Sequence, residues 1–363
     1  ETVKGLVAEG VMQQRWEKHN AQLARLGLKS RLLSFAIINS TQMIQQIATI
    51  AVVTSGVYLI IAGNLTVGGL IACTILTGRS LGPMTQVAGI ITRFHHSKSA
   101  FSAIDKLMQL PVERPANKNF LSRNNISSEI EFANVGFKYD GQKVSALENI
   151  SFKIEEGEKV AILGRTGSGK STIQRLIMGF YNATEGSILL GNTDINQIDP
   201  QEIRKNISFV PQEVSLFSGT IRQNITLGSP LKKDEDMLIA SEIAGISDFI
   251  NKHPMGFELD VGERGANLSG GQRQGIGIAR ALFSDGETLM FDEPTASMDN
   301  TSEKIFIKNF LTFIENKTLI LITHKASMLT LVDRIIILDR GKLVTDGPKD
   351  KVLEMLSKNP TPN

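Results

Sequence analysis

The strongest pattern in the chain is a stretch of 47 residues, from Leu32 to Gly78, that contains no Asp, Glu, Lys, Arg or His. A helix that crosses a lipid bilayer needs about 20 mostly apolar residues. The turn-forming sequence Gly63–Thr66 divides the stretch into two segments, near Ser34–Ala62 and Val67–Thr92. The pattern therefore predicts two membrane-spanning helices joined by a short turn. The alternative is a buried helical hairpin in a large soluble protein.

Charged residues around this hairpin predict its orientation. Lysines and arginines precede the first segment and follow the second, and the turn has none, so the positive-inside rule places both ends in the cytoplasm. Arg79 interrupts the second segment. An arginine near the centre of a membrane helix costs about 2.5–3.5 kcal/mol, so we expect it to face other helices or a cavity. Whether it lines a substrate path or has a structural role stays open.

The pattern changes after the hairpin. A further helical segment leads to two prolines, Pro111 and Pro115, where apolar periodicity is lost and a linker is expected. From Ser128 onward, short β-branched strands alternate with helical patterns, which predicts an α/β domain with a mainly parallel sheet. The predicted parts are a membrane part over residues 1–110, a linker over 111–127 and an α/β domain over 128–357.

Composition changes this picture little. The 363 residues include 39 basic and 37 acidic side chains, a net charge of +2, which gives no electrostatic case for nucleic-acid binding. Cys73 is the only cysteine, so an intrachain disulfide framework and a cysteine-based zinc site are both excluded. The mean hydropathy of −0.02 resembles that of a soluble protein because it averages an apolar hairpin with a polar domain.

A glycine-rich sequence in the α/β domain has the pattern of a phosphate-binding loop. The apolar run Lys159–Leu163 predicts a buried strand, and Gly-x-x-x-x-Gly-Lys-Ser and a helical pattern follow it. In such a loop, backbone N–H groups converge on phosphate oxygens, the lysine reaches the terminal phosphates and the next hydroxyl binds Mg²⁺. The predicted nucleotide-binding residues are Gly164, Arg165, Thr166, Gly167, Ser168, Gly169, Lys170, Ser171 and Thr172.

Two adjacent acids, Asp292 and Glu293, follow the apolar run Thr288–Phe291. A nucleotide hydrolase needs a carboxylate near the metal and a group that orients the attacking water. We predict that Asp292 contacts Mg²⁺ through water and that Glu293 acts as the general base.

Between the loop and these acids stands Leu268-Ser269-Gly270-Gly271-Gln272, which resembles the signature of the ATP-binding cassette (ABC) ATPases. The family's other motifs follow in the expected order over about 200 residues. They are Tyr139, expected ahead of the first strands, Gln212 in Val210-Pro211-Gln212, Asp299 in Ser297-Met298-Asp299, and His324 after an apolar run.

The resemblance implies a role for each of these residues. Tyr139 would stack on adenine, Gln212 would contact Mg²⁺ or the attacking water, and His324 would hydrogen-bond the γ-phosphate and Glu293. The signature residues would bind the nucleotide of a second copy in a head-to-tail homodimer with two composite sites. Asp299 would help to shape the facing site across that dimer.

Membrane helices directly ahead of the ATPase resemble the exporter branch of the family. In this comparison the segment Glu1–Glu17 is similar to the end of a fourth membrane helix and the coupling helix after it. The two predicted spans would then be the last two of six, and we expect the earlier helices to lie outside this sequence. The fold class implied is a partial exporter membrane domain followed by an α/β phosphate-loop ATPase domain.

Finer features resemble the type I secretion ATPases, closest to exporters of large repeat-containing (RTX) adhesins. These features are Leu110–Pro115, Gly164–Gly167 and Ser297–Asp299. They imply a multi-pass protein of the bacterial inner membrane with a cytoplasmic ATPase domain. Such a protein would export a polypeptide using ATP and Mg²⁺, with a periplasmic adaptor and an outer-membrane channel as partners. Two alternatives are a lipid or multidrug exporter and, less consistent with the hairpin, a soluble mechanical ABC ATPase.

Overall fold

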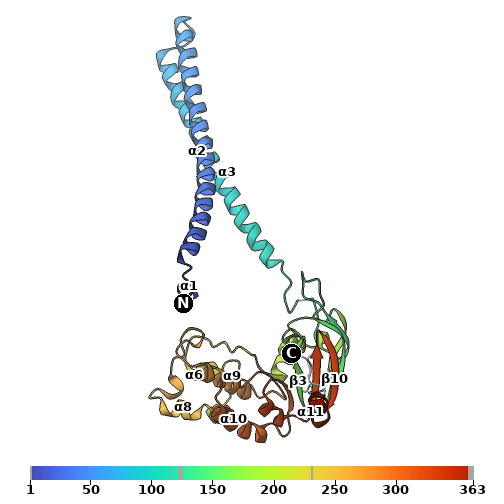
Figure 1. Cartoon of the computed structure of the whole chain (residues 1–363). Helices are drawn as coiled ribbons and strands as arrows, with labels where there is room; N and C mark the ends of the chain where they lie inside the picture. Colours follow the sequence, from blue (N-terminus) through green and yellow to red (C-terminus); the bar gives the residue numbers. More distant parts are fainter. Residues whose placement is uncertain (1, 116, 122–125, 230–231, 359–363) are drawn as a thin grey trace. The chain divides into compact units, whose positions relative to one another are not determined.

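The computed structural model of the chain describes residues 2–115, 117–121, 126–229 and 232–358. Within the second long helix, it leaves out the side chains of residues 84, 85, 88, 89, 91, 92, 95 and 96. The chain divides into two compact units, Glu1–Val112 and Glu113–Asn363, called here the helical unit and the α/β unit (Figure 1). The division falls inside the predicted linker, of which residues 116 and 122–125 lie outside the described part.

The helical unit contains α1 (Thr2–Gly5), α2 (Glu9–Ile61) and α3 (Val67–Met108). The turn between α2 and α3 uses Gly63 at a φ of 77°, and the Thr66 hydroxyl caps α3 by accepting a hydrogen bond from Gly69 N at 3.1 Å. Both helices run well beyond the predicted spans. Between Arg15 and Arg31, and again between Arg93 and Met108, the sequence has many polar residues but no proline, so nothing there ends a helix.

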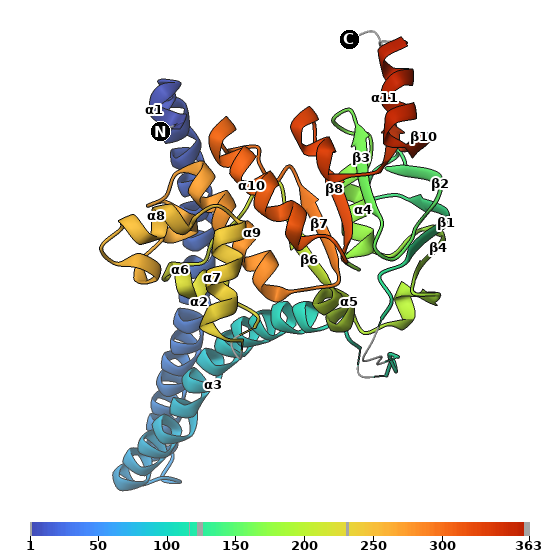
Figure 2. The ribbon, with the colours of Figure 1, turned by 90° about the horizontal axis from the view of Figure 1, so that it is seen from below.

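The hairpin packs most closely beside its turn. α2 and α3 lie side by side near the turn and separate farther from it (Figures 1 and 2). A Cβ atom on Gly56 would lie 2.3 Å from Leu70 Cδ1, so the missing side chain lets the two helices approach each other. In α2, Gly56 is the one buried residue.

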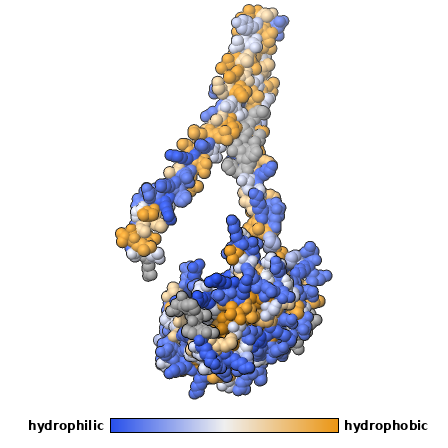
Figure 3. Space-filling view, turned by 45° about the vertical axis from the view of Figure 1, so that its right-hand side comes forward, coloured by the Kyte–Doolittle hydropathy of each residue, from blue (hydrophilic) through white to orange (hydrophobic). Residues whose placement is uncertain are grey.

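Most other apolar side chains of the hairpin are exposed, and Figure 3 shows them spread over its surface, whereas hydrophilic residues dominate the visible face of the α/β unit. Among the described helices, only α2 is long and apolar enough to cross a membrane. The second predicted span, which carries Arg79 and Pro83, does not reach that measure over its described residues and stays a prediction. An apolar surface of this size needs lipid or other helices to cover it.

The α/β unit is built on a six-stranded sheet in the order β10-β9-β3-β8-β7-β6. All neighbouring strands are parallel except β10, which pairs antiparallel with β9. The parallel strands are apolar and largely buried, as the sequence predicts for a sheet covered on both faces. Their bounds are Lys159–Gly164 (β3), Ile207–Val210 (β6), Thr288–Asp292 (β7), Thr318–Ile322 (β8) and Arg334–Asp339 (β9), with Lys342–Pro348 (β10) at the edge.

A second, antiparallel sheet was not distinguished from the sequence. It contains β2 (Leu147–Ile154), β1 (Ile130–Phe137), β4 (Glu185–Leu190) and β5 (Thr193–Asp194), in that order across the sheet. One hydrophobic core joins its apolar face to helix α4 (Lys170–Ile177) and to one face of the main sheet. This core holds α4, and therefore the loop before it, in place.

The remaining helices complete the unit. A second core joins the other face of the main sheet to α7 (Asp234–Ile243), α9 (Gly270–Ser284) and α10 (Asn300–Phe313). In Figure 2, α6 to α9 gather on one side of the unit, and α4 and the antiparallel strands lie on the other. The other α-helices of the unit are α5 (Pro200–Asn206), α6 (Ile221–Ile225), α8 (Ser247–Lys252) and α11 (Lys349–Lys358).

Candidate functional site

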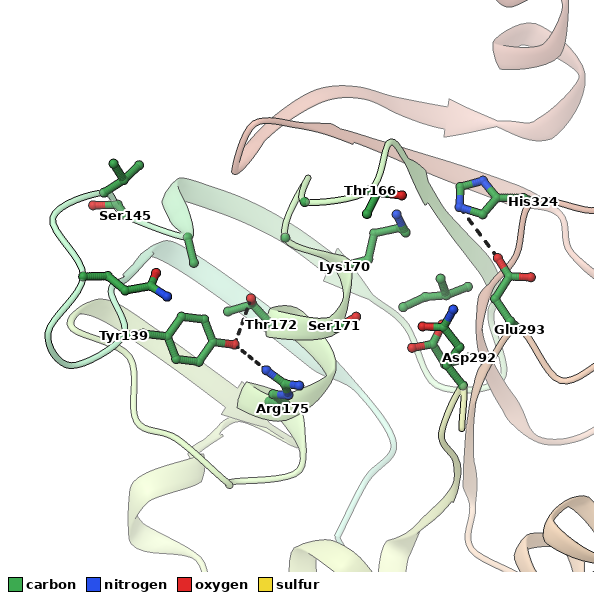
Figure 4. Close-up of a pocket in the computed structure, with 17 residues that line it drawn as sticks. Tyr139, Ser145, Thr166, Lys170, Ser171, Thr172, Arg175, Asp292, Glu293 and His324 are labelled. Carbon is green, nitrogen blue, oxygen red and sulfur yellow. Dashed lines mark hydrogen bonds and ion pairs between the residues drawn. The ribbon is translucent and has the colours of Figure 1, made fainter. Parts of the chain in front are cut away.

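The carboxyl ends of three neighbouring parallel strands open onto one cavity. Ile322 at the end of β8 lies in register between Ile162 of β3 and Asp292 of β7, so the loops after these strands start side by side. The cavity has a volume of about 500 Å³. Its lining includes Lys170, Asp292 and His324, one residue from each of the three loop regions (Figure 4). A site at this edge is typical of α/β sheets.

The loop between β3 and α4 requires glycine at two positions. Gly164 has a φ of 154°, and a Cβ atom there would lie 2.3 Å from Leu338 O; at Gly169, with a φ of 106°, it would lie 2.5 Å from Leu147 Cδ2. The loop ends at the N-terminus of α4, where free backbone N–H groups and the helix dipole favour an anion. The loop therefore lies between a strand and a helix, where the sequence predicts it.

Lys170 lies across this loop. Its Nζ atom donates hydrogen bonds to Gly164 O at 2.6 Å and to Arg165 O at 3.0 Å. Burial lowers the pKa of Lys170, although Asp292 and Glu293 act in the opposite direction. A partly buried ammonium beside a helix N-terminus forms a strongly electropositive cradle for phosphate oxygens.

The two acids at the end of β7 have different environments. Asp292 is 6% exposed, and burial together with the charge of Glu293 raises its pKa to about 6. Glu293 has a φ of 49°, a strained conformation for a residue with a side chain, and its N–H donates to Ile322 O at 2.8 Å. Such strain is typical of functional sites, where the surrounding structure must hold it.

The Glu293 carboxylate points toward His324 (Figure 4). The distance from His324 Nε2 to Glu293 Oε1 is 3.7 Å, and this buried oxygen accepts no hydrogen bond from the part of the chain that the structure describes. A buried carboxylate oxygen with no donor is costly unless a ligand or water completes it. Glu293 is therefore available to accept a proton from a water molecule in the cavity.

Oxygen donors suited to Mg²⁺ face the same space. Ser171, Gln212 and Asp292 all line the cavity, and hydroxyl, amide and carboxylate oxygens are ligands of this hard cation. The described residues contain no cluster of three or more His, Cys, Asp or Glu suited to a metal. This donor set therefore fits Mg²⁺ bound together with phosphate oxygens and water, and it does not form an all-protein cage.

Tyr139 lies at the opposite end of the cavity from the acids (Figure 4). It follows β1 instead of preceding the first strands as expected, because the antiparallel sheet begins at Ile130. Its hydroxyl accepts a hydrogen bond from Arg175 Nη1 at 2.9 Å and lies 3.2 Å from Thr172 Oγ1. The ring packs edge-on against Phe137 and Tyr181. These contacts hold an aromatic side chain at the cavity in a fixed orientation.

The signature residues lie elsewhere. Ser269 caps α9 by accepting a hydrogen bond from Gln272 N at 3.3 Å, while the Gln272 side chain accepts one from Ser269 N at 2.9 Å. With Gly270, Gly271 and Asp299 they line a separate cavity of about 380 Å³, which shares no lining residue with the first. Leu268 is buried and does not line this cavity.

Two family models match the chain, and they cover different parts of it. The model described as "ABC transporter" matches residues 147–296, and the model described as "ABC transporter transmembrane region" matches residues 1–84. The first contains the phosphate-binding loop and both acids, and the second contains most of the predicted membrane hairpin. The chain belongs to the ABC transporter family.

This ABC transporter chain is similar in sequence to proteins named for toxin export and translocation. It is 34% identical over 353 residues to the leukotoxin export ATP-binding protein LtxB of Aggregatibacter actinomycetemcomitans, and 34% identical over 352 residues to the alpha-hemolysin translocation ATP-binding protein HlyB of Escherichia coli. Each alignment covers 97% of this chain and 50% of the relative, so the chain spans about half the length of the curated relatives it matches.

A solved structure of a bacterial Atm1-family ABC exporter with ATP bound has the same fold. The TM-score is 0.87 at 30% sequence identity, and the match covers 99% of this chain and 62% of that one. The predicted fold class, a helical transmembrane region followed by an α/β ABC ATPase domain, is confirmed.

The main cavity of the ABC transporter chain unites most, but not all, of the predicted site. Tyr139, Gln212, Asp292, Glu293 and His324 line it, as do Thr166, Gly167, Gly169, Lys170, Ser171 and Thr172; Gly164, Arg165 and Ser168 belong to the loop but do not line it. Sequence reasoning missed six lining residues: Gln142, Val144, Ser145, Ala146, Arg175 and Ile322. Arg175 could have been found from its spacing, because it lies three residues after Thr172 in the same helix.

Proposed function

We propose that this chain binds ATP with Mg²⁺ and hydrolyses it at two composite sites in a head-to-tail dimer, and that hydrolysis drives export across a membrane. The observation that carries the proposal is the presence of two separate anion-binding surfaces in one chain. The loop of Lys170 and the capped N-terminus of α9 at Ser269 line different cavities. One γ-phosphate can contact both only if the second surface comes from another copy.

Different parts of the cavity would bind different parts of Mg²⁺-ATP. Tyr139 at one end offers a ring face for adenine, where an aromatic contact contributes about 0.5–1.5 kcal/mol. The loop N–H groups and Lys170 bind the phosphates in the middle. Mg²⁺ would be held by Ser171, Gln212 and Asp292 and would neutralise phosphate charge.

At the far end, Glu293 and His324 act on the reacting atoms. The attacking water transfers a proton to Glu293 while its oxygen bonds to the γ-phosphorus, and the bond from that phosphorus to the bridging oxygen breaks, so ADP leaves. His324, which lines the cavity and whose side chain is more than half exposed, would hydrogen-bond the γ-phosphate and keep Glu293 oriented.

A polypeptide is the cargo best supported by the relatives. Leukotoxin and alpha-hemolysin translocation proteins are 34% identical to this chain, and the sequence features noted above favour type I secretion of an RTX-type adhesin. The protein would then be a multi-pass protein of the bacterial inner membrane, with its ATPase domain in the cytoplasm. Its partners would be a second copy, a periplasmic adaptor and an outer-membrane channel.

Export of a lipid or drug is the second candidate, because the exporter fold, which an Atm1-family structure shares over 99% of the chain, does not by itself select the cargo. Loss of surface display of a large repeat protein after deletion in the native host would support polypeptide export. Normal display, with loss of lipid or drug efflux, would support the alternative.

Glu293→Gln tests the ATPase assignment. Loss of a general base lowers rates by about 10²–10⁴-fold, while ATP binding should persist because no phosphate contact is removed. An undiminished rate of ATP hydrolysis in this variant would show that Glu293 is not the base.

Mixed dimers test the composite sites. Chains with Lys170→Ala and chains with Ser269→Arg should each be inactive alone, and mixing them should restore one working site per dimer. Absence of activity in purified mixed dimers would refute the head-to-tail arrangement.

A further inference from the structure

A single buried amide joins the signature helix to Glu293, the proposed general base. Gln274 lies in α9 and is 3% exposed. Its Nε2 atom donates a hydrogen bond to Glu293 O at 2.7 Å, and its Oε1 atom accepts one from Ser297 N at 2.9 Å. Both ends of the amide are therefore satisfied by main-chain groups of the segment that follows β7.

The backbone of Glu293 depends on this contact. Its N–H is bound to Ile322 O at the end of β8, and its carbonyl is bound to Gln274, so the residue is tied to the sheet on one side and to α9 on the other. A φ of 49° is unfavourable for glutamate and persists only where surrounding contacts hold it. Removing the amide should free the carbonyl and let the carboxylate turn away from the water it activates.

The signature end of α9 is coupled to the same segment by close packing. A Cβ atom on Gly271 would lie 2.9 Å from Ser297 O, and one on Gly270 would lie 3.4 Å from Ser297 Cβ. The first turn of α9 therefore rests directly on Ser297. Gln274, one turn farther along the helix, bonds that residue's N–H. A shift of the first turn of α9 would therefore press on Ser297, whose N–H is bound by the same amide that binds Glu293 O.

The geometry points to Gln274 as a positioning residue that ties the general base of its own copy to the signature helix, whose first turn would face the nucleotide of the partner copy. This inference rests on the proposed function, in which the signature of one copy binds the nucleotide of its partner. Gln274 does not line the cavity of Lys170. It acts through Glu293 and should leave nucleotide affinity unchanged.

Gln274→Met and Gln274→Glu in the 363-residue chain, purified from membranes, test the role. Methionine removes both hydrogen bonds at similar volume, and glutamate keeps the acceptor for Ser297 N but loses the donor to Glu293 O. For both variants we expect kcat to fall about tenfold, the effect of one lost positioning contact, while KM for ATP and binding of Mg²⁺-ATP stay within about twofold.

Ser241→Ala is the matched control. Ser241 is buried in α7, which packs against α9, and its hydroxyl donates to Met237 O of its own helix. Ser241→Ala should disturb packing around α9, but its kcat and KM should equal those of the wild type. A wild-type kcat in both Gln274 variants, or a fall in kcat matched by weaker nucleotide binding, would overturn the inference.

Mixed dimers locate the effect. When one copy carries Lys170→Ala, the single working site uses the loop and Glu293 of the other copy and the signature of the Lys170→Ala copy. Gln274→Met should lower kcat about tenfold when it lies in the copy that supplies Glu293, and less than about twofold in the copy that supplies the signature. Equal losses in the two arrangements would overturn the inference. A wild-type chain without ATP hydrolysis would instead refute the proposed function.

Discussion

Replacing Lys325 with methionine should destabilise the α/β unit, because Lys325 neutralises a buried carboxylate beside the site. Its Nζ atom donates to Thr295 O at 2.7 Å and forms an ion pair with Glu303, which is 6% exposed. Ser327 Oγ also donates to Glu303. Thr295 lies two residues after Glu293, and Lys325 directly follows His324, so this cluster fixes the segments that carry both groups.

The size of the effect follows from burial. Removing one partner of a buried ion pair costs about 3–5 kcal/mol. The Lys325 side chain is 32% exposed, so water can partly replace it, and we expect a loss somewhat below that range, about 2–3 kcal/mol. At about 2–4 °C per kcal/mol for a unit of this size, Tm should fall by roughly 5–10 °C.

The assay is thermal unfolding of the nucleotide-free chain, with Lys304→Met as a matched control. Lys304 is an exposed neighbour of Glu303, and such a surface change should alter stability by no more than about 0.5 kcal/mol. In the double variant Lys325→Met/Glu303→Gln, no buried charge is left unpaired, so most of the lost stability should return. A Lys325→Met variant as stable as Lys304→Met, or a double variant less stable than either single one, would refute the reasoning.

Four further predictions concern the main cavity. Burial raises the pKa of Asp292 to about 6, so protons should compete with Mg²⁺ below that pH and weaken Mg²⁺-dependent nucleotide binding. In binding titrations from pH 5 to 8, Asp292→Asn should lack this part of the pH dependence. The same shift means that the folded chain holds this proton between pH 3.8 and about 6 while the unfolded chain releases it. Without Mg²⁺, the contribution of Asp292 to the free energy of unfolding should therefore decrease as pH rises through that window. If the stability of Asp292→Asn relative to wild type increased as pH fell through the window, this prediction would be wrong. Gly164→Ala should abolish nucleotide binding or folding, because its Cβ would lie 2.3 Å from Leu338 O, and normal binding would contradict the loop geometry. Tyr139→Ala should weaken ATP binding by up to about tenfold through loss of stacking. Tyr139→Phe keeps the ring and should lose much less ATP affinity. Equal losses of affinity in the two variants would show that the hydroxyl, and not the ring, contributes to binding.

Several features were determined by the sequence alone because each resides in consecutive residues. The phosphate-binding loop, the paired acids and the signature are short motifs whose backbone groups act together wherever they are placed. The absence of charge from Leu32 to Gly78 likewise predicts a hairpin, since the cost of burying charge in a bilayer does not depend on the rest of the fold. The predicted parallel sheet followed from apolar strand runs that must be covered on both faces.

Other features depend on contacts between residues far apart in the chain, and only the tertiary structure decided them. The antiparallel sheet, which places Tyr139 after β1, forms by pairing of segments that no local pattern joins. The amide of Gln274 reaches Glu293 across 19 residues, and Lys325 reaches Glu303 across 22. The separation of the signature from the loop of Lys170 also arises from packing, because each motif begins a different helix on a different part of the sheet. The residue types in the motifs indicate the chemistry of this chain. The long-range hydrogen bonds and the packing of the core determine which of those groups lie close enough to act on one another.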